Sequence, residues 1–415
     1  MHMLTRGEAM PYDLLIKGGH VLDPGQGLNA TLDIGVTNGR IAAIQADIPA
    51  TEAKKVVEVH GSNRFVVPGL LDIHTHVAHG ATTAGVGMEC CDPDIAGVLS
   101  GVTTVLDCGS VGVANVGVFP NHILPKAKTR VICFLNVGSY AHTMPLPADV
   151  NSMDEVNQKA IAACVQANPG LVRGIKLRLV GPVVAEKGEE LITLSKAIAS
   201  EHHIPLMVHI GDGRAEGEYA GQMTRFLLGK AFTPGDILTH LCTPHRGGVM
   251  DSARKPVPEL KEARDRGVVL DPALGAGNFG YEIAREQAQL GLHPDTISSD
   301  LTAGGRKRIV YSLMECMGRF MAVGYSLSDV IRMATANAAK ALGMQDELGA
   351  LAVGREADIT VLDEHEGHFR FLDTTQLVFQ GDHALTPVVT VRAGEVFVPD
   401  WGPHPWGWLP ERMAA

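Results

Sequence analysis

The sequence predicts an α/β protein: a (β/α)8 TIM barrel joined to a small discontinuous β-sandwich domain formed by the N- and C-terminal segments. Eight short apolar runs recur at spacings of roughly 30 residues, with helix-sized stretches between them, which favours the barrel. Alternating, turn-rich segments flank this region on both sides and favour the β domain. We therefore expect a β domain from 12–66 plus 352–400, a barrel from 67–351 and a tail from 401–415.

The first β segment contains three alternating runs, YDLLIKGGHVLD, TLDIGVTNGRIAAIQA and KVVEVHG. Asn38 and Gly39 lie in the middle of the second run, and both residues tolerate positive φ, so they predict a hairpin turn. The C-terminal segment returns to the same pattern with ADITVLD and VVTVRAGEVFV. These strands of the two ends are expected to pair with one another.

The barrel strands are predicted from apolar runs that follow Pro68-Gly69. In order they are LLDIHTHV, TTVLDCG, RVICFLNVG, RGIKLRL, PLMVHIG, DILTHL, GVVLDPAL and DTISSDL. After them, SLSDVIRMATANAAKALG predicts helices, with Ser326 and Asp329 at capping-box spacing and Gly343 as a stop.

Composition narrows the class of protein. The chain has 415 residues, 45% of them hydrophobic, and 35 basic against 46 acidic side chains, a net charge of −11. This balance argues against nucleic acid or an anionic membrane as a partner, and no apolar run approaches the roughly 20 residues of a membrane span. Seven cysteines and an N-terminus without the apolar core of a signal peptide favour a cytoplasmic location. We also expect a homo-oligomer, and the Trp-rich tail could dock on its own subunit or on a neighbour.

Two histidines stand at the end of the first barrel strand. His74 and His76 are separated by one residue, so in an extended strand both side chains project from the same face. Neutral imidazoles on one face can hold a zinc ion together. Two chance histidines near a strand end are the alternative.

Other metal-ligand side chains stand at the ends of further strands. Lys176 lies in the fourth strand, His209 and His240 end the fifth and sixth, and Asp300 ends the eighth. Taken alone, each has a plain structural interpretation, such as a satisfied core histidine, a lysine that reaches to solvent or a helix cap. Because active groups of such barrels gather at the carboxyl ends of the strands, their coincidence favours a metal site.

This set of residues resembles the amidohydrolase superfamily of metal-dependent hydrolases in its binuclear subtype, and specifically its dihydroorotase-like amidohydrolase/deacetylase group. The resemblance extends from DLLIKGGHVLDP through VVPGLLDIHTH to VGREADITVLD. It implies two divalent metal ions, usually zinc. The implied ligands are His74, His76 and Asp300 for the first ion, His209 and His240 for the second, and Lys176, N6-carboxylated by carbon dioxide, between them.

The implied chemistry is hydrolysis by a hydroxide that bridges the two ions. Carboxylation turns the amine of Lys176 into an anion that neutralises part of their charge. Two ions lower the pKa of a bridging water and polarise the scissile carbonyl. Asp300 is the catalytic residue that takes the proton and passes it to the leaving atom.

The substrate is expected to be a small anionic molecule. Arg178 shares the face of Lys176 and could bind a carboxylate, with a rim salt bridge as the equal alternative. Asn278, in the loop after the seventh strand, could line the pocket, or the loop could be a plain turn. Arg214, Asp271, Tyr140, His142 and His245 are weaker candidates, and Cys108 and Cys242 are expected to pack.

Two positions separate this sequence from cyclic-amide hydrolases. Dihydroorotases usually carry an Arg where this chain has Ala78, and hydantoinases a Tyr shortly after the bridging lysine, where LRLVGPV follows Lys176. We therefore expect a deacetylase of N-acyl amino acids or O-acyl hydroxy acids, with a cyclic amidohydrolase as the alternative. A catalytically silent scaffold would lack ligands, and a deaminase would normally lack the bridging lysine.

Overall fold

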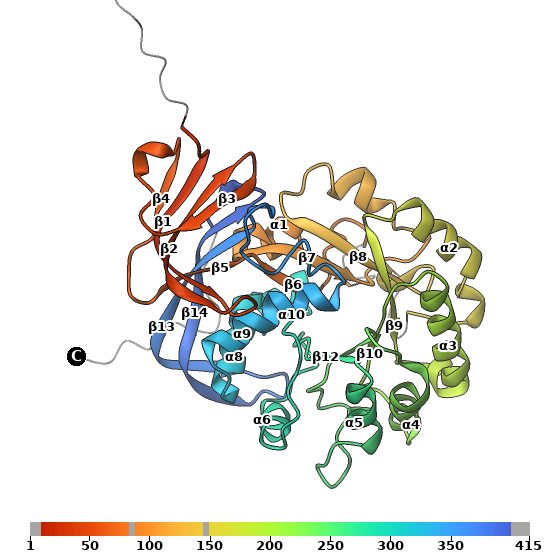
Figure 1. The fold of residues 1–415 in the computed structure, drawn as a ribbon. Helices are drawn as coiled ribbons and strands as arrows, with labels where there is room; N and C mark the ends of the chain where they lie inside the picture. The colour runs from red at the N-terminus through yellow and green to blue at the C-terminus, as the bar shows by residue number, and fades with distance from the viewer. Residues whose placement is uncertain (1–9, 83–87, 144–148, 400–415) are drawn as a thin grey trace, which may run out of the picture.

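The barrel is present as a sheet of seven parallel strands in the order β12-β11-β10-β9-β8-β7-β6 (Figure 1). The computed structural model describes residues 10–82, 88–143 and 149–399. The strands are β6 (Leu70–Thr75), β7 (Val102–Cys108), β8 (Arg130–Asn136), β9 (Val172–Arg178), β10 (Leu206–His209), β11 (Ile237–Thr239) and β12 (Val269–Asp271). Each coincides with one of the first seven predicted runs, so the predicted barrel fold is confirmed.

The run predicted as the eighth strand does not form a regular strand in the described structure, but a short segment of it is hydrogen-bonded between β6 and the loop after β12. Asp300 N donates to His74 O (2.7 Å) and His76 N donates to Leu301 O (2.9 Å), which joins the segment to β6. On its other side, Gly275 N donates to Ser299 O (2.9 Å). Asp300 has a φ of 52°, outside the β region, so a regular ladder ends at this residue.

Helices surround the barrel, and α2 and α3 pack against β9 (Figure 1). The α-helices are α1 (Pro93–Ala96), α2 (Gln158–Ala167), α3 (Pro182–Glu201), α4 (Tyr219–Phe226), α5 (Pro258–Asp265), α6 (Tyr281–Gln289), α7 (Ala303–Arg306), α8 (Leu313–Val323), α9 (Leu327–Ala334) and α10 (Ala336–Ala341). Short helical turns are η1 (Ala50–Glu52), η2 (Val98–Ser100), η3 (Phe119–Ile123), η4 (Ala141–Thr143), η5 (Met153–Glu155) and η6 (Leu227–Ala231). The predicted capping box of Ser326 and Asp329 is present at the start of α9. Within the described residues, no helix combines the length and apolarity that a membrane crossing requires.

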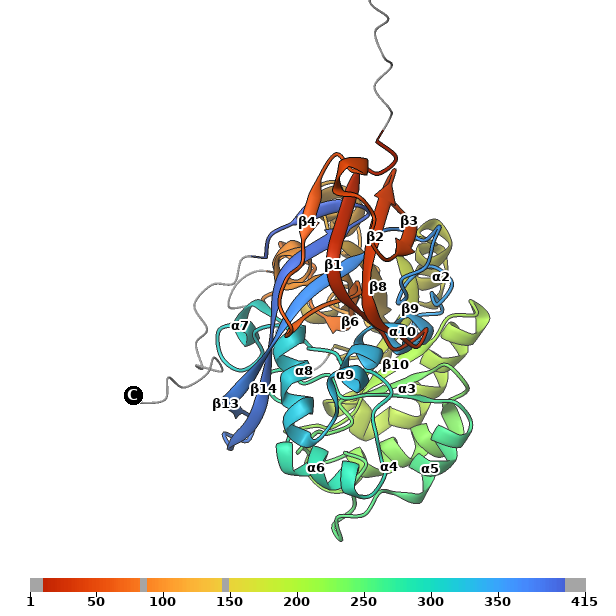
Figure 2. The ribbon, with the colours of Figure 1, turned by 60° about the vertical axis from the view of Figure 1, so that its left-hand side comes forward.

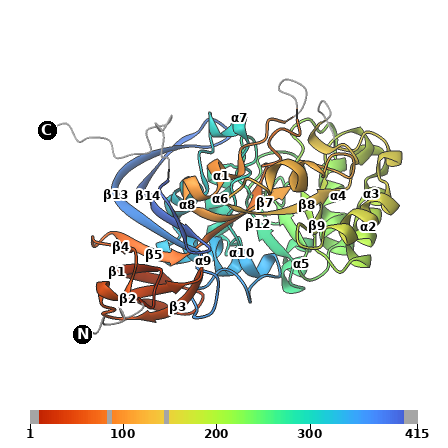
Figure 3. The same ribbon diagram turned by 90° about the horizontal axis from the view of Figure 1, so that it is seen from above.

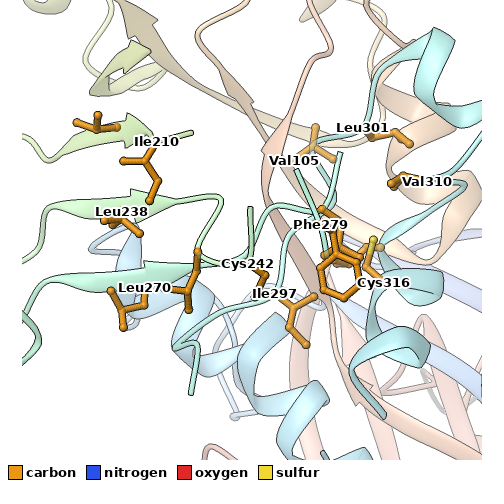
Figure 4. Close-up of a cluster of buried hydrophobic side chains, with 14 of the residues drawn as sticks. Val105, Ile210, Leu238, Cys242, Leu270, Phe279, Ile297, Leu301, Val310 and Cys316 are labelled. Atoms are coloured by element: carbon orange, nitrogen blue, oxygen red, sulfur yellow. The ribbon is translucent and has the colours of Figure 1, made fainter. Parts of the chain in front are cut away.

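Two apolar clusters hold the barrel together. One joins inward side chains of the strands, including Ile73, Phe134 and Met207, to Ala338 and Leu342 at α10. The larger cluster lies between strands and surrounding segments; Figure 4 shows part of it, with Leu238 and Leu270 from the strands. In most of these strands, such as β10 with Met207 in one cluster and Leu206 and Val208 in the other, alternate side chains belong to different clusters, as expected for strands buried on both faces.

The two ends of the chain pair into one mixed sheet (Figure 3). Its path is β15-β14-β13-β5-β1-β2-β3, with β4 paired to β1. The strands are β1 (Leu14–Asp23), β2 (Leu28–Thr37), β3 (Arg40–Gln45), β4 (Val56–Glu58), β5 (Arg64–Pro68), β13 (Ile359–Leu372), β14 (Val378–Arg392) and β15 (Glu395–Phe397). Asn38 and Gly39 form the predicted turn with φ values of 50° and 73°. The domain limits given above stay predictions, and the tail from 401–415 lies outside the described residues.

The hairpin of β13 and β14 is longer than the sequence analysis predicts. The predicted strands end near Asp363 and begin again near Val388, whereas the observed strands continue to Leu372 and start at Val378. The outer half runs past α8 (Figure 2). Its Phe369 and Phe371 are buried and alternate with exposed neighbours, so the sequence HFRF has the period of two that is typical of a half-buried strand.

Candidate metal centre

Six side chains, here called the ligand cluster, meet at the carboxyl end of the barrel strands. They are His74, His76, Lys176, His209, His240 and Asp300. His74 lies in β6 and Lys176 in β9. His209 is the last residue of β10, and His240 directly follows β11. All but Asp300 are buried, and 13% of the Asp300 side chain is exposed.

The distances within the ligand cluster are short. His74, His240 and Asp300 each offer one ligand atom within 4.8 Å of the others. Asp300 Oδ1 lies 3.1 Å from His76 Nε2, and Lys176 Nζ lies 3.3 Å from His74 Nε2. The rings of His209 and His240 are 4.1 Å apart. The structure thus brings all six predicted positions together; their roles stay predictions.

Neighbouring groups fix the orientation of two rings. The Thr239 hydroxyl donates a hydrogen bond to Asp271 Oδ2 (2.8 Å), so its oxygen accepts one from His74 Nδ1–H (2.9 Å). His240 Nδ1 must donate to the carbonyl of Ala273 (2.7 Å). In both rings the Nε2 lone pair therefore faces the cluster, the arrangement found when a second group orients a metal-binding histidine.

The other two imidazoles are held differently. His209 Nε2 lies 3.2 Å from the carbonyl of Gly211 and therefore donates to it, which leaves Nδ1 as the atom that could bind an ion. His76 Nδ1 lies 2.8 Å from Ser110 Oγ. Because a hydroxyl both donates and accepts, either tautomer of His76 fits this site.

The electrostatics of the cluster favour neutral imidazoles. Burial lowers the pKa of His240 to about 3, and it lowers the pKa values of His74 and His209 well below the ordinary value. The charge of Lys176 adds to the effect at His74. Burial alone would raise the pKa of Asp300, but the hydrogen bond from His76 and nearby positive charge lower it. Neutral histidine and ionised carboxylate are the forms that bind metal ions.

The backbone is strained where the cluster is built. His240 has a φ of 71° and Asp300 a φ of 52°, values that side chains other than glycine rarely adopt. Gly275, at φ 56°, passes so close that a Cβ there would lie 2.1 Å from Asp300 Oδ2. Such conformations cost free energy and persist mainly at functional sites.

A sequence model described as the amidohydrolase family matches residues 65–397. This chain belongs to the amidohydrolase family. A deacetylase of Brucella anthropi is 30% identical over 372 residues, 88% of each chain. A deacetylase of Enterococcus faecalis is 27% identical over 392 residues, 94% of this chain and 100% of the relative.

Two solved structures extend the comparison. One, described as an adenine deaminase, has a TM-score of 0.83 and 27% identity, covering 93% of this chain and 100% of its own. A dihydroorotase has a TM-score of 0.78 and 25% identity, covering 93% and 98%. The fold is therefore that of the amidohydrolase barrels, and the chain is a hydrolytic enzyme.

Beside the ligand cluster, where the His142 ring lies 4.8 Å from that of His76, this amidohydrolase has a second polar group. It consists of buried His142 and Asp149 and partly exposed Arg178, and is here called the rim triad. Arg178 Nη1 donates to Asp149 Oδ1 (2.9 Å), and His142 Nε2 lies 3.1 Å from the same oxygen. Asn136 donates to Asp149 Oδ2 (2.8 Å). Burial would raise the pKa of Asp149, but the charge of Arg178 holds it below its ordinary value. The salt bridge that the sequence analysis kept as an alternative for Arg178 is present.

The sequence alone did not predict Asp149 as a functional residue, and it favoured Asp271 only weakly. Asp149 was missed, because it lies in a loop without any motif. Asp271 was only a weak candidate, yet it accepts hydrogen bonds from Thr239, Thr296 and Ser298 beneath His74. Its place at the end of β12 was the available signal.

The remaining sequence candidates are placed as follows. Asn278 Nδ2 lies 3.4 Å from Asp300 Oδ2, so the predicted loop does reach the cluster. Tyr140 and Arg214 are exposed. Cys108 contacts Met207 (3.0 Å between sulfur atoms), and burial raises the pKa of its thiol to about 12. Cys108 therefore packs, as expected.

Proposed function

We propose that this amidohydrolase is a binuclear metal-dependent deacetylase of small anionic substrates, either N-acyl amino acids or O-acyl hydroxy acids. The observation that carries the metal assignment is the buried Nε2 of His240. Within the part of the chain that the structure describes, this atom has no hydrogen-bond partner, although a buried polar nitrogen normally has one. Its lone pair faces the other ligand-type atoms, and a cation there would satisfy it.

The donor set fits divalent zinc. Imidazole nitrogen and carboxylate oxygen are both zinc ligands, and neutral histidines are the form that binds. The four histidines and Asp300 supply five such groups from separate strand ends. We assign His74, His76 and Asp300 to one ion and His209 and His240 to the other.

Lys176 is proposed to be N6-carboxylated and to lie between the ions. Its side chain is buried, and among the described residues its nitrogen contacts His74 Nε2 and Met207 Sδ rather than a carboxylate. A buried ammonium without an anionic partner is costly. The ammonium first loses a proton, and the neutral amine then forms a bond to the carbon of carbon dioxide and releases a second proton. The product is an anion with two oxygen atoms that can bind metal.

Two bound cations would lower the pKa of a water molecule and polarise the scissile carbonyl. The residues of the chain do the rest. Asp300, ionised in its surroundings, accepts the proton of the attacking water and delivers it to the nitrogen or oxygen that leaves. Thr239 and Asp271 hold His74 in one tautomer, so the ligand geometry is set before substrate arrives.

Arg178 is proposed to bind the substrate carboxylate, with Asn278 as a second contact. The contacts of Arg178 with Asp149 and His142 both use Nη1. The rest of the guanidinium fork can then face a substrate anion. Asp149 would hold Arg178 in position for that contact.

We also propose a cytoplasmic location, supported by seven free cysteines. A homo-oligomer and the absence of nucleic-acid and membrane partners stay predictions. The alternative function, ring opening of a cyclic amide, draws support from the dihydroorotase likeness. The acyclic substrate is favoured by the deacetylase relatives, whose similarity extends over 88 to 94% of this chain. It is also favoured by Ala78, which replaces the arginine of dihydroorotases, and by the lack of a tyrosine shortly after Lys176.

The test is a turnover panel with protein loaded with zinc in the presence of bicarbonate. It contains N-acetyl amino acids, O-acetyl hydroxy acids, dihydroorotate, hydantoins and adenine, with Asp300→Asn protein as the control for contaminating activity. We expect hydrolysis of acetylated acids by the wild-type protein alone. Turnover restricted to the cyclic amides or to adenine would overturn the deacetylase proposal.

A further inference from the structure

The tip of the β13–β14 hairpin binds the loop that follows β12, although the two lie in different parts of the fold. Thr374 N donates to Phe279 O (3.1 Å), and Phe279 N donates to Thr374 Oγ1 (3.1 Å). The Thr374 hydroxyl in turn donates to Phe279 O (2.7 Å). Both backbone groups of Phe279 are thus satisfied by one residue of the hairpin.

Asp373 makes the second link and replaces a helix cap. Its Oδ2 accepts from Tyr281 N (3.0 Å), the first residue of α6, whose own N-cap residue, Gly280, has no side chain to do so. Its Oδ1 accepts from Thr375 N (2.8 Å) and Leu377 N (3.0 Å), which shapes the turn. One carboxylate therefore fixes both the hairpin tip and the end of the loop.

Aromatic packing supports these polar links. The Tyr281 ring stacks on Phe379 of β14 with centroids 3.9 Å apart, and Phe279 lies fully buried 5.8 Å from Phe320 of α8. The outer half of the hairpin is not held by the rest of the terminal sheet, because β13 pairs with β5 only from Ile359 to Asp363. The outer half contacts α8, Tyr281 at the start of α6, and this loop.

The other end of the same loop surrounds the Asp300 carboxylate. Gly275 N donates to Ser299 O (2.9 Å), and the Gly275 backbone leaves no room for a side chain beside Asp300 Oδ2. Asn278, the residue before Phe279, points Nδ2 to the same oxygen at 3.4 Å. A displacement of Phe279 would therefore move the groups that confine Asp300.

We propose that Asp373 and Thr374 are positioning residues, through which the C-terminal hairpin fixes loop 274–280 and with it the Asp300 carboxylate. The proposal rests on the proposed function to the extent that Asp300 acts in turnover. A loose carboxylate would still bind substrate but would transfer the proton less often, so the effect belongs in kcat rather than in KM.

The experiment compares Thr374→Val with two matched variants. Thr374→Val keeps the shape and removes the hydroxyl, Thr374→Ser keeps the hydroxyl, and Thr386→Val makes the same change elsewhere on the hairpin, where the hydroxyl contacts His365 (2.9 Å). We expect Thr374→Val to lower kcat roughly tenfold with KM within about twofold. Thr374→Ser and Thr386→Val should resemble wild type.

Hydrogen–deuterium exchange of the segment 274–281 gives a readout that needs no substrate. Faster exchange in Thr374→Val, absent in Thr374→Ser and Thr386→Val, is expected if the hairpin holds the loop. Unchanged exchange, or faster exchange with unchanged kcat, would overturn the positioning role. If the wild-type protein turned over no acylated acid, the proposed function would fail, while unchanged exchange would separately overturn the link between hairpin and loop.

Discussion

The ligand cluster and the rim triad lie at the same end of the barrel, but they differ in how they balance charge. In the rim triad, the Asp149 carboxylate takes hydrogen bonds on both oxygens and neutralises Arg178 directly. In the ligand cluster, the lysine amine faces an imidazole, and the buried Nε2 of His240 has no partner among the described residues. Both groups contain a buried imidazole nitrogen without a partner among the described residues, Nδ1 of His142 and Nε2 of His240. The difference lies in the charged groups: the rim triad contains its own anion beside its cation, whereas the buried amine of Lys176 has no carboxylate within ion-pair distance in the part of the chain that the structure describes.

Replacing Lys176 tests the ligand cluster and has the largest expected effect of the variants. Lys176→Ala removes the proposed bridging anion, so bound metal and turnover should fall together, with turnover down by roughly 10⁴-fold because several kcal/mol of charge stabilisation are lost. Metal content by elemental analysis and kcat with an acetylated acid measure both. Lys261→Ala, which breaks an exposed ion pair with Asp265 on α5, is the control. Two ions per chain in Lys176→Ala would disprove the bridge.

Asp300→Asn separates proton transfer from the fold. The amide keeps the size of the carboxylate but cannot accept the water proton, so we expect kcat to fall roughly a thousandfold while the circular dichroism spectrum and the oligomeric state stay unchanged. Asp265→Asn, on an exposed helical ion pair, should leave kcat within about twofold. Near-normal turnover by Asp300→Asn would remove the shuttle role.

Asp149→Asn tests whether the charge of Asp149 holds the rim triad together. Because Arg178 holds the pKa of Asp149 below its ordinary value of 3.8, the carboxylate stabilises the folded protein above that pH. The contribution is lost as pH falls through the lower folded-state pKa. Breaking this buried pair should cost about 3 kcal/mol at pH 7.

Urea denaturation at pH 7, 4 and 3 checks the sign of that prediction. The difference in unfolding free energy between wild type and Asp149→Asn should be largest at pH 7. It should begin to shrink below the ordinary pKa of 3.8, because the unfolded chain then takes up a proton that Asp149 in the folded protein does not. A difference that stays constant down to pH 3 would mean that the carboxylate charge is not what stabilises the triad. Asp265→Asn again serves as the control.

The sequence was sufficient to predict that the side chains of the ligand cluster lie close together, because each stands at or near the end of a recognisable barrel strand. Strand periodicity places His74 and His76 on one face, and the carboxyl ends of parallel strands meet at one edge, so His209, His240 and Asp300 could be grouped before any contact was known. The predicted eighth strand is present only as a short segment hydrogen-bonded to β6, with Asp300 at a positive φ inside it.

Other features depend on contacts between distant segments and have no local signature. Asp149 meets Arg178 across 29 positions of the chain, and its loop carries no motif. The hydroxyl of Thr239 decides the tautomer of His74 from 165 positions away. The partner of Thr374 is 95 residues earlier, so its role is visible only once the hairpin and the loop are folded together.

Arg178→Met has the smallest expected effect. It distinguishes a rim triad that binds substrate from one that only supports the neighbouring ligand cluster. If the guanidinium binds the substrate carboxylate, KM should rise about tenfold for acetylated acids and hardly at all for neutral esters of the same acyl group, since a hydrogen bond to a charged group contributes about 1.5 kcal/mol or more. Arg225→Met, in an exposed ion pair with Glu259, is the matched control. Equal changes for both substrates would mean that Arg178 serves only Asp149, and that the rim triad supports the loop without touching the substrate.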